Sequence, residues 1–169
     1  MLTIRQALEH EYAAIGQLTA DAYAPVLTFG AADPYRPTLM DAAGRAAKAE
    51  LWVAIGHRSI AGTVTVCRPG GPYAEIAAPS ELEVRMLAVS PDRQGQGIGS
   101  SLMAAVHETA ATENFESVVL SVIDSNTAAA AFYDRLGYVH EATRDWQPLP
   151  KVTLQVWRRS VAAVTSGRD

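Results

Sequence analysis

Hydrophobic residues recur along this chain at two spacings, which separate predicted helices from predicted strands. In residues 9–23 the spacing is helical, and the residues that share one face are Tyr12, Ile15, Leu18 and Ala22. Further helices are predicted for residues 38–49, 97–113 and 127–136. Pro25 ends the first helix, Gly44 weakens the second and Gly137 caps the last.

Strands are predicted where residues are apolar at every or every second position, which selects residues 2–7, 51–55, 59–67, 81–89, 117–123, 139–144 and 152–157. A short turn joins the second and third strands, so they should form an antiparallel hairpin. Residues 117–123 are apolar almost throughout, which is typical of a buried strand. Antiparallel strands come first and one parallel crossover follows. The sequence therefore predicts a mixed α/β (α+β) sheet of six to seven strands flanked by four helices.

The length of 169 residues fits one domain. We expect this domain to span residues 1–159 and to be followed by a weakly ordered tail, residues 160–169. No internal repeat or linker divides the chain. The loop of residues 68–80, rich in proline and glycine, is long enough to suggest a functional role.

Composition and charge exclude several classes of function. A net charge of -4 and a pI of about 5.5 argue against a basic nucleic-acid footprint and against binding to anionic membranes. Cys67 is the only cysteine, so no internal disulfide can form, and the four histidines have no metal-ligand spacing. With no signal peptide and no apolar run long enough for a membrane span, a cytoplasmic location is expected. Cys67 itself is expected to be a buried small residue and not a nucleophile.

A glycine-rich loop leads from the predicted strand 81–89 into the helix 97–113. Gly95, Gly97 and Gly99 alternate with other residues and remove Cβ atoms where a ligand could approach the backbone. The first turn of a helix also leaves N–H groups without partners at the positive end of the helix dipole. These features together predict a phosphate site, to which Arg93 could add a charge.

Three kinds of phosphate loop compete for this segment. A P-loop requires lysine after the glycines, but Ser100 and Ser101 follow Gly99. A dinucleotide fingerprint requires glycine at position 100 and glycines close behind the first strand of a βαβ unit, and the chain has neither. The segment 94–99, Gln-Gly-Gln-Gly-Ile-Gly, resembles the coenzyme A pyrophosphate loop of the GNAT N-acetyltransferase superfamily. The plain alternative is a glycine turn that merely begins a helix.

A second segment strengthens this resemblance. Residues 126–138 are similar to the family's downstream signature of Asn, then Ala, then Phe-Tyr, then Leu-Gly-Tyr. The resemblance implies the acyl-CoA N-acyltransferase fold, with a splay between its central parallel strands. It further implies an acetyl-CoA-dependent N-acetyltransferase that moves acetyl directly to a primary amine of a small molecule or a protein, without a metal. The alternatives are a non-catalytic coenzyme A-binding regulatory domain and a nucleotide-binding protein of another class. Because the family often forms homodimers, a homodimer stays open.

The resemblance also assigns cofactor residues. The main chain of residues 87–89 would bond the pantetheine arm, and Tyr133 would protonate the departing thiolate. A half-buried tyrosine with a satisfied hydroxyl and a helix-capping Asn126 are the plain alternatives. The full cofactor-binding set is Leu87, Ala88, Val89, Arg93, Gln94, Gly95, Gln96, Gly97, Ile98, Gly99, Ser100, Asn126, Ala129 and Tyr133.

The acceptor side depends on the strand 81–89. If pairing is regular, one face of this strand carries Glu81, Glu83, Arg85, Leu87 and Val89. Glu83 is the candidate base, acting through water as in some family members, and Glu81 is the second candidate. Arg85 could instead pair with Glu83 or hold a substrate carboxylate. Aromatic residues expected near the acceptor are Tyr23, Tyr35, Tyr73 and Trp146; no role follows for Arg144 or Asp145.

Overall fold

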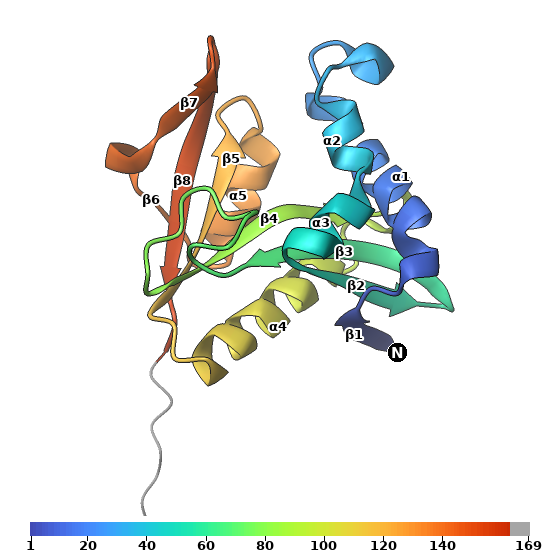
Figure 1. Ribbon diagram of the computed structural model, residues 1–169, viewed down its shortest axis with the longest axis horizontal. Coiled ribbons are helices and arrows are strands. Elements are labelled where there is room, and N and C mark those ends of the chain that lie inside the picture. The colour runs from blue at the N-terminus through green and yellow to red at the C-terminus, as the bar shows by residue number, and fades with distance from the viewer. Residues whose placement is uncertain (163–169) are drawn as a thin grey trace, which may run out of the picture.

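Eight strands form one mixed sheet in the computed structural model, which describes residues 1–162 (Figure 1). The strand order is β1-β2-β3-β4-β5-β8-β6, and β7 pairs with β8 beside this path. Only β4 and β5 pair in parallel; every other pair is antiparallel. The strands are β1 Leu2–Gln6, β2 Glu50–Gly56, β3 Ser59–Cys67, β4 Glu81–Val89, β5 Ser117–Ile123, β6 Val139–His140, β7 Trp146–Leu149 and β8 Val152–Ser160.

Helices cover both faces of the sheet: α1 Tyr12–Tyr23, α2 Arg36–Met40, α3 Ala42–Lys48, α4 Ile98–Thr112 and α5 Thr127–Arg135. The alternation of β2 separates the two faces. Val53 packs against Ile15 of α1, whereas Trp52 and Ala54 belong to the larger cluster that contains Leu102 of α4. One face therefore carries α1–α3 and the other carries α4 and α5.

The predicted helix 38–49 is two helices, because the backbone turns at Asp41. Asp41 has ψ of 66° and its carboxylate accepts the N–H of Gly44 at 2.8 Å, which caps α3. The predicted strand 139–144 ends at His140, and β7 was not expected. Pro148 within β7 removes a ladder donor, which weakens the sequence signal for a strand. These differences lie away from β4 and β5, in the helices before β2 and in the two short strands that pair with β8.

The last strand is longer than predicted. β8 continues to Ser160, and the N–H of Val161 donates to Glu116, so the predicted tail is wrong in its first two residues. The rest of that prediction, from residue 163 on, lies outside the described residues.

The sheet opens between β4 and β5. Their parallel pairing stops at Val84 and Leu120, although β4 stays paired to β3 as far as Val89 and β5 stays paired to β8 as far as Ile123. Beyond the last pair, the facing edges of β4 and β5 have no strand partner. The expected splay between the central parallel strands is therefore confirmed.

A bulge in β4 coincides with the opening. Met86 adopts φ of 51°, a left-handed conformation that is rare for a side chain of this size, and the register with β3 shifts there. Met86 packs under α1 and α2 beside Arg85, whereas Leu87 and Val89 join the core on the α4–α5 face. The expectation of one continuous face from residue 81 to residue 89 is therefore wrong after Arg85, because the extra residue reverses the alternation.

Glu81 ties three separate segments together. Its buried carboxylate accepts two hydrogen bonds from Arg144 at 2.9 Å, one from Arg158 and one from the N–H of Ala78. Arg144 also donates to the carbonyl of Ile76 at 2.8 Å. Burial opposes ionisation of Glu81, but the hydrogen bonds outweigh it and hold the pKa of this carboxyl below its usual value. Glu81 is therefore a structural anchor for the loop before β4, and Arg144 gains the role that the sequence did not give it.

Arg144→Met should lower the free energy of unfolding by about 2 kcal/mol at pH 7, because it leaves a buried carboxylate with fewer partners. The stability from Glu81 is present above its unfolded pKa, about 4.3, and is lost as the pH falls through its lower folded pKa. The difference in the free energy of unfolding between the wild type and Arg144→Met should therefore become smaller at acidic pH. Urea unfolding at pH 7 and pH 4 measures this. Arg58→Met, at an exposed arginine with no ion pair within residues 1–162, is the control and should change little.

Candidate active site

A cleft of about 980 Å³ lies at the opening between β4 and β5. β4 and β5 contribute Arg85–Val89 and Ser121–Ile123 to its walls, and the glycine loop and α5 contribute a third side. The segment from the end of α1 to Tyr35 and the β7–β8 hairpin complete it. Figure 1 shows these surroundings: β5, β7, β8 and α5 on one side, α1 and α2 on the other.

The glycine loop supplies unpaired backbone donors to this cleft. Gly95 and Gly97 both have φ of 78°, which a residue with a side chain adopts at a cost. Gly97 is the N-cap of α4, and the first bond of the helix runs from the N–H of Ser101 to the carbonyl of Gly97 at 3.0 Å. The N–H groups of residues 98–100 therefore have no helical partner, and these residues line the cleft.

Gly99, the third glycine of the loop, is needed for close packing and not for its backbone conformation. A Cβ on Gly99 would lie 3.2 Å from Cζ of Phe132, which is tighter than ordinary contacts. Gly99 thus allows α4 and α5 to approach closely beside the cleft. Sequence reasoning treated the three glycines alike, and the structure divides them into two that set the backbone and one that sets the packing.

Most of the predicted cofactor residues line the cleft: Leu87, Ala88, Val89, Gln94, Gly95, Gly97, Ile98, Gly99, Ser100, Asn126, Ala129 and Tyr133. Arg93 and Gln96 do not. The guanidinium of Arg93 donates to the carbonyl of Gly56 and to the hydroxyl of Ser59, both at 2.7 Å, so it fastens the loop to the β2–β3 turn. Arg93 thus has a structural role, and the phosphate contact expected of it stays a prediction.

Tyr133 lies on α5 with 7% of its surface exposed. Its ring makes edge contacts with Phe132 and Tyr138, with centroids 5.1 Å and 5.5 Å away. Burial, with smaller contributions from Tyr23 and Tyr138, raises the pKa of Tyr133 well above its usual value. Its hydroxyl makes no hydrogen bond with the protein within residues 1–162, and the residue lines the cleft.

Asn126 caps α5, which is the structural role given above as the alternative to binding the cofactor. Its side-chain oxygen accepts the N–H of Ala129 at 3.1 Å, which leaves the amide nitrogen without a hydrogen bond among the described residues, and Asn126 lines the cleft. The cap does not exclude a ligand contact, because the oxygen and the nitrogen of one amide can serve different partners.

Glu83 is almost fully buried, with 2% of its surface exposed, and lines the cleft. One oxygen, Oε2, accepts three successive backbone N–H groups, from Glu75, Ile76 and Ala77, at 2.8–3.1 Å. The other oxygen, Oε1, has no partner within residues 1–162. Burial raises the pKa of Glu83 against the opposing effect of these N–H groups and of Arg85. The expected ion pair between Glu83 and Arg85 is not formed.

Arg85 is instead engaged by the loop before β4. It pairs with Glu75, donates to the carbonyl of Tyr73 at 2.9 Å and lies over the Tyr73 ring at 4.1 Å. Tyr73 does not line the cleft, but it contacts two residues that do, Arg85 through its ring and Met86 through its hydroxyl. A cation that is already paired and stacked is poorly suited to bind a substrate carboxylate.

The other aromatic candidates differ in whether they line the cleft. Tyr23 and Tyr35 line the cleft, whereas Trp146 does not. Trp146 donates from Nε1 to the hydroxyl of Ser121 at 3.3 Å and so links β7 to β5. Sequence reasoning missed several lining residues, which include Phe29, Asp33, Arg135 and Leu149. Phe29, Asp33 and Leu149 lie in segments without a periodic signal or known motif, so only the fold brings them to the cleft. Arg135 lies within the segment 126–138, but the resemblance assigned it no role.

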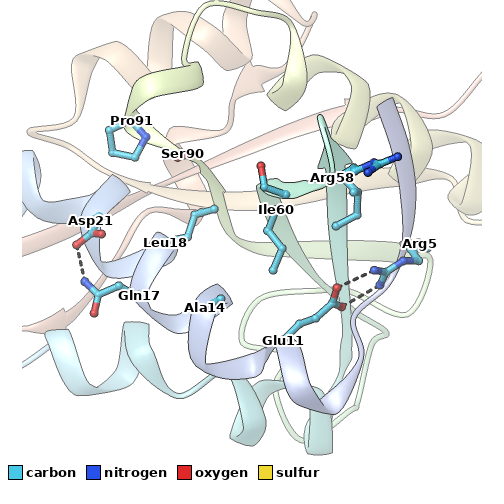
Figure 2. A pocket seen from close by; sticks show the side chains of 12 residues that line it. Arg5, Glu11, Ala14, Gln17, Leu18, Asp21, Arg58, Ile60, Ser90 and Pro91 are labelled. Carbon is cyan, nitrogen blue, oxygen red and sulfur yellow. Dashed lines mark hydrogen bonds and ion pairs between the residues drawn. The ribbon is translucent and has the colours of Figure 1, made fainter. Parts of the chain in front are cut away.

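A second, shallower groove of about 570 Å³ runs between α1 and the β2–β3 hairpin (Figure 2). Several of its polar groups pair with one another: Arg5 donates to Glu11 at 2.7 Å and 2.8 Å, and Gln17 donates to Asp21 at 2.7 Å. Arg58 also lines the groove and makes no ion pair within residues 1–162. The hydrogen bonds from Arg5 outweigh burial and hold the pKa of Glu11 at about 2. This groove holds none of the predicted site residues.

The sequence model of the Acetyltransferase (GNAT) family matches residues 13–138, which include the glycine loop, the β4–β5 opening and α5. The chain belongs to the GNAT acetyltransferase family. The match covers both segments on which the resemblance rested, and the fold is the GNAT fold.

Solved GNAT structures share this architecture at low sequence identity. The ribosomal-protein-S18-alanine N-acetyltransferase from Escherichia coli superposes with a TM-score of 0.70 at 18% identity, over 100% of this chain and 99% of that one. The PaiA N-acetyltransferase from Thermoplasma acidophilum, solved in complex with coenzyme A, gives 0.72 at 12% identity, over 92% and 98%. At these identities the likeness concerns the fold.

One curated relative shares more sequence over a shorter stretch. The mycothiol acetyltransferase of Salinispora arenicola is 39% identical over 72 residues, which is 42% of this chain and 21% of that protein. The chain thus matches about a fifth of the length of this relative. Within residues 1–162, no cluster of three His, Cys, Asp or Glu side chains could hold a metal ion, and no helix has the length and apolarity needed to cross a bilayer.

Proposed function

We propose that this GNAT protein is an N-acetyltransferase that moves acetyl from acetyl-coenzyme A directly to a primary amine. The observation that carries the proposal is one continuous cleft, which borders the unpaired N–H groups of α4, the unpaired edge of β4, Tyr133 and Glu83. Phosphate, thioester, acid and base would thus meet in one site.

The cofactor side is built mainly from backbone. The N–H groups of residues 98–100 and the positive end of α4 suit a pyrophosphate. Residues 87–89 have no strand partner on the β5 side, so their N–H and C=O groups are free to bond the amide groups of pantetheine. Asn126 can donate from its amide nitrogen. The exposed Arg135 lines the cleft one turn after Phe132, which touches Gly99, and adds a positive charge on this side.

Tyr133 is suited to be the acid. Because burial raises the pKa of Tyr133 well above its usual value, the hydroxyl keeps its proton at neutral and mildly alkaline pH. In water a thiol, with a pKa near 8.5, is a stronger acid than tyrosine, so protonation of the thiolate would be unfavourable. A thiolate formed in the cleft would also lose stability through burial, so its pKa would rise as well and this unfavourable difference would shrink.

Glu83 is suited to be the base. Its Oε2 is held by the three N–H groups, so its Oε1 is fixed in position and free to accept a proton from the ammonium or from a water. Burial raises its pKa toward the range in which a carboxylate is a useful base. One carboxylate thus anchors the loop and serves the chemistry with different oxygens.

A non-catalytic coenzyme A-binding domain is the alternative. It would need the glycine loop but neither an acid nor a base. The free hydroxyl of Tyr133 and the free Oε1 of Glu83, both on the same cleft, favour the enzyme.

Gly97→Ala should weaken coenzyme A binding, because the left-handed backbone costs about 1 kcal/mol with a Cβ and the loop will shift its donors to relieve that cost. Calorimetric titration with coenzyme A measures the affinity. Gly70→Ala is the matched control, since Gly70 has nearly the same φ of 76° and equally open surroundings but lies outside the cleft. Gly70→Ala should lose similar stability and keep its affinity. Equal affinities in the two variants would contradict the assignment of the loop.

Tyr133→Phe should lower kcat by about 10²–10⁴-fold, because the thiolate then leaves without a proton donor. Thiol release from acetyl-coenzyme A in the presence of a panel of amines measures the rate. The rise in Tm on adding coenzyme A should be retained, since the phosphate loop is untouched. Unchanged turnover would remove the acid role, and a wild-type protein that binds coenzyme A but acetylates no amine would favour the binding domain.

Glu83→Gln should lower kcat/KM, because only the ionised carboxylate acts as base. The variant should also lose the acidic limb of the pH profile, which is the fall of kcat/KM at low pH. In the wild type, kcat/KM should fall as the pH drops through the pKa of Glu83, which burial has raised. A glutamine oxygen can still accept the three N–H groups, so the fold should survive. Glu81→Gln is the control: Glu81 does not line the cleft, so the acidic limb should persist there. An acidic limb at the same pH in Glu83→Gln would show that another group acts as the base.

A further inference from the structure

The part of the cleft away from the glycine loop has apolar walls. One wall comes from the last residue of α1 and the segment that follows it, and contains Tyr23, Val26, Leu27, Phe29, Pro34 and Tyr35. The other comes from the β7–β8 hairpin and contains Pro148, Leu149, Val152 and Leu154. Figure 1 shows that these two segments rise on opposite sides of the opening. We call them the acceptor walls.

The acceptor walls hold apolar surface that the fold itself does not bury. Phe29, Tyr35 and Leu149 are 67%, 41% and 62% exposed, and they are among the few large hydrophobic side chains on the surface of the described chain. Exposed apolar groups that gather at a cleft mark a binding surface for an apolar ligand. A small hydrophilic amine would leave these groups in water.

The charged groups at the acceptor walls are acidic or already paired. Asp33, Glu75 and Glu83 line this part of the cleft, and the one cation beside them, Arg85, pairs with Glu75. Asp33 accepts the N–H groups of Phe29 and Tyr35 at 3.2 Å and 2.9 Å. Arg135, the other cation of the cleft, lies on α5 beside the glycine loop. An ammonium is favoured here, whereas a carboxylate would meet like charges and no free donor.

From the acceptor walls and their charges we infer that the acceptor is a primary amine on an apolar, aromatic body with no carboxylate beside the amine. The inference rests on the proposed acetyl transfer and narrows its acceptor. An arylalkylamine has this chemistry, and so does the α-amine of an aromatic residue at a peptide N-terminus, whose carboxyl is an amide. Free amino acids are disfavoured by their carboxylate, and polyamines by their lack of an apolar body.

The test compares four amines with acetyl-coenzyme A and the purified protein: 2-phenylethylamine, phenylalanine amide, phenylalanine and spermidine. The first two should exceed the last two in kcat/KM by about tenfold or more, because a buried carboxylate without a partner is costly. A higher value for the amide than for phenylethylamine would identify a peptide terminus, and the reverse a free amine. A preference for phenylalanine or spermidine would overturn the inference.

Two variants test the acceptor walls directly. Phe29→Ala and Leu149→Ala should each raise KM for phenylethylamine by about threefold to tenfold, while KM for ethylamine stays unchanged because it is too small to reach them. Both positions are exposed, so the fold should tolerate the change. Val139→Ala, at an exposed apolar residue outside the cleft, is the control and should change neither value. Equal effects of all three variants would overturn the inference.

Failure of the proposed function can be told apart from failure of the inference. If the protein binds coenzyme A but acetylates no amine, the proposed transfer fails. Calorimetric titration of the four amines into the protein–coenzyme A complex then decides the inference by itself. Tighter binding of phenylethylamine or phenylalanine amide than of phenylalanine supports it, and the opposite order overturns it.

Discussion

The end of pairing between β4 and β5 at Val84 and Leu120 is the constraint on which the site depends. Had the parallel ladder continued, the backbone of residues 87–89 would be saturated and the sheet would be closed. The bulge at Met86 maintains the separation by placing two successive side chains, Arg85 and Met86, under α1 and α2. The strained backbone at this position is held by the packing of Met86 against α1 and α2, and it lies where the cleft opens.

Carboxylates organise the loop before β4. Glu83 collects three backbone N–H groups and Glu81 a fourth, and Arg144 links Glu81 to the carbonyl of Ile76. A loop with few apolar contacts thereby gains a fixed conformation. The same hydrogen bonds leave one oxygen of Glu83 directed for use, so the structural and the proposed catalytic roles of this residue support each other.

The cleft differs in charge along its length. Near the glycine loop it offers backbone donors, a helix terminus and Arg135, all of which suit phosphate. At the acceptor walls it offers carboxylates and apolar side chains, which suit an amine on an apolar body. The overall charge of -4 hides this division, because a sum over the chain does not record where charges lie.

The sequence by itself determined the family, the order of the elements and the glycine loop, because these depend on local patterns: apolar periodicity, glycine spacing and the segment 126–138. The sequence also predicted the bounds of β4 and β5, and most of the residues predicted to bind the cofactor lie along the cleft. The tertiary structure alone decided the bulge at Met86, the pairing of Arg85 with Glu75, and the anchoring roles of Arg93 and Arg144. It also brought together the two segments that form the acceptor walls. Those features depend on which residues distant in sequence come together, and local pattern carries no record of a partner in another segment.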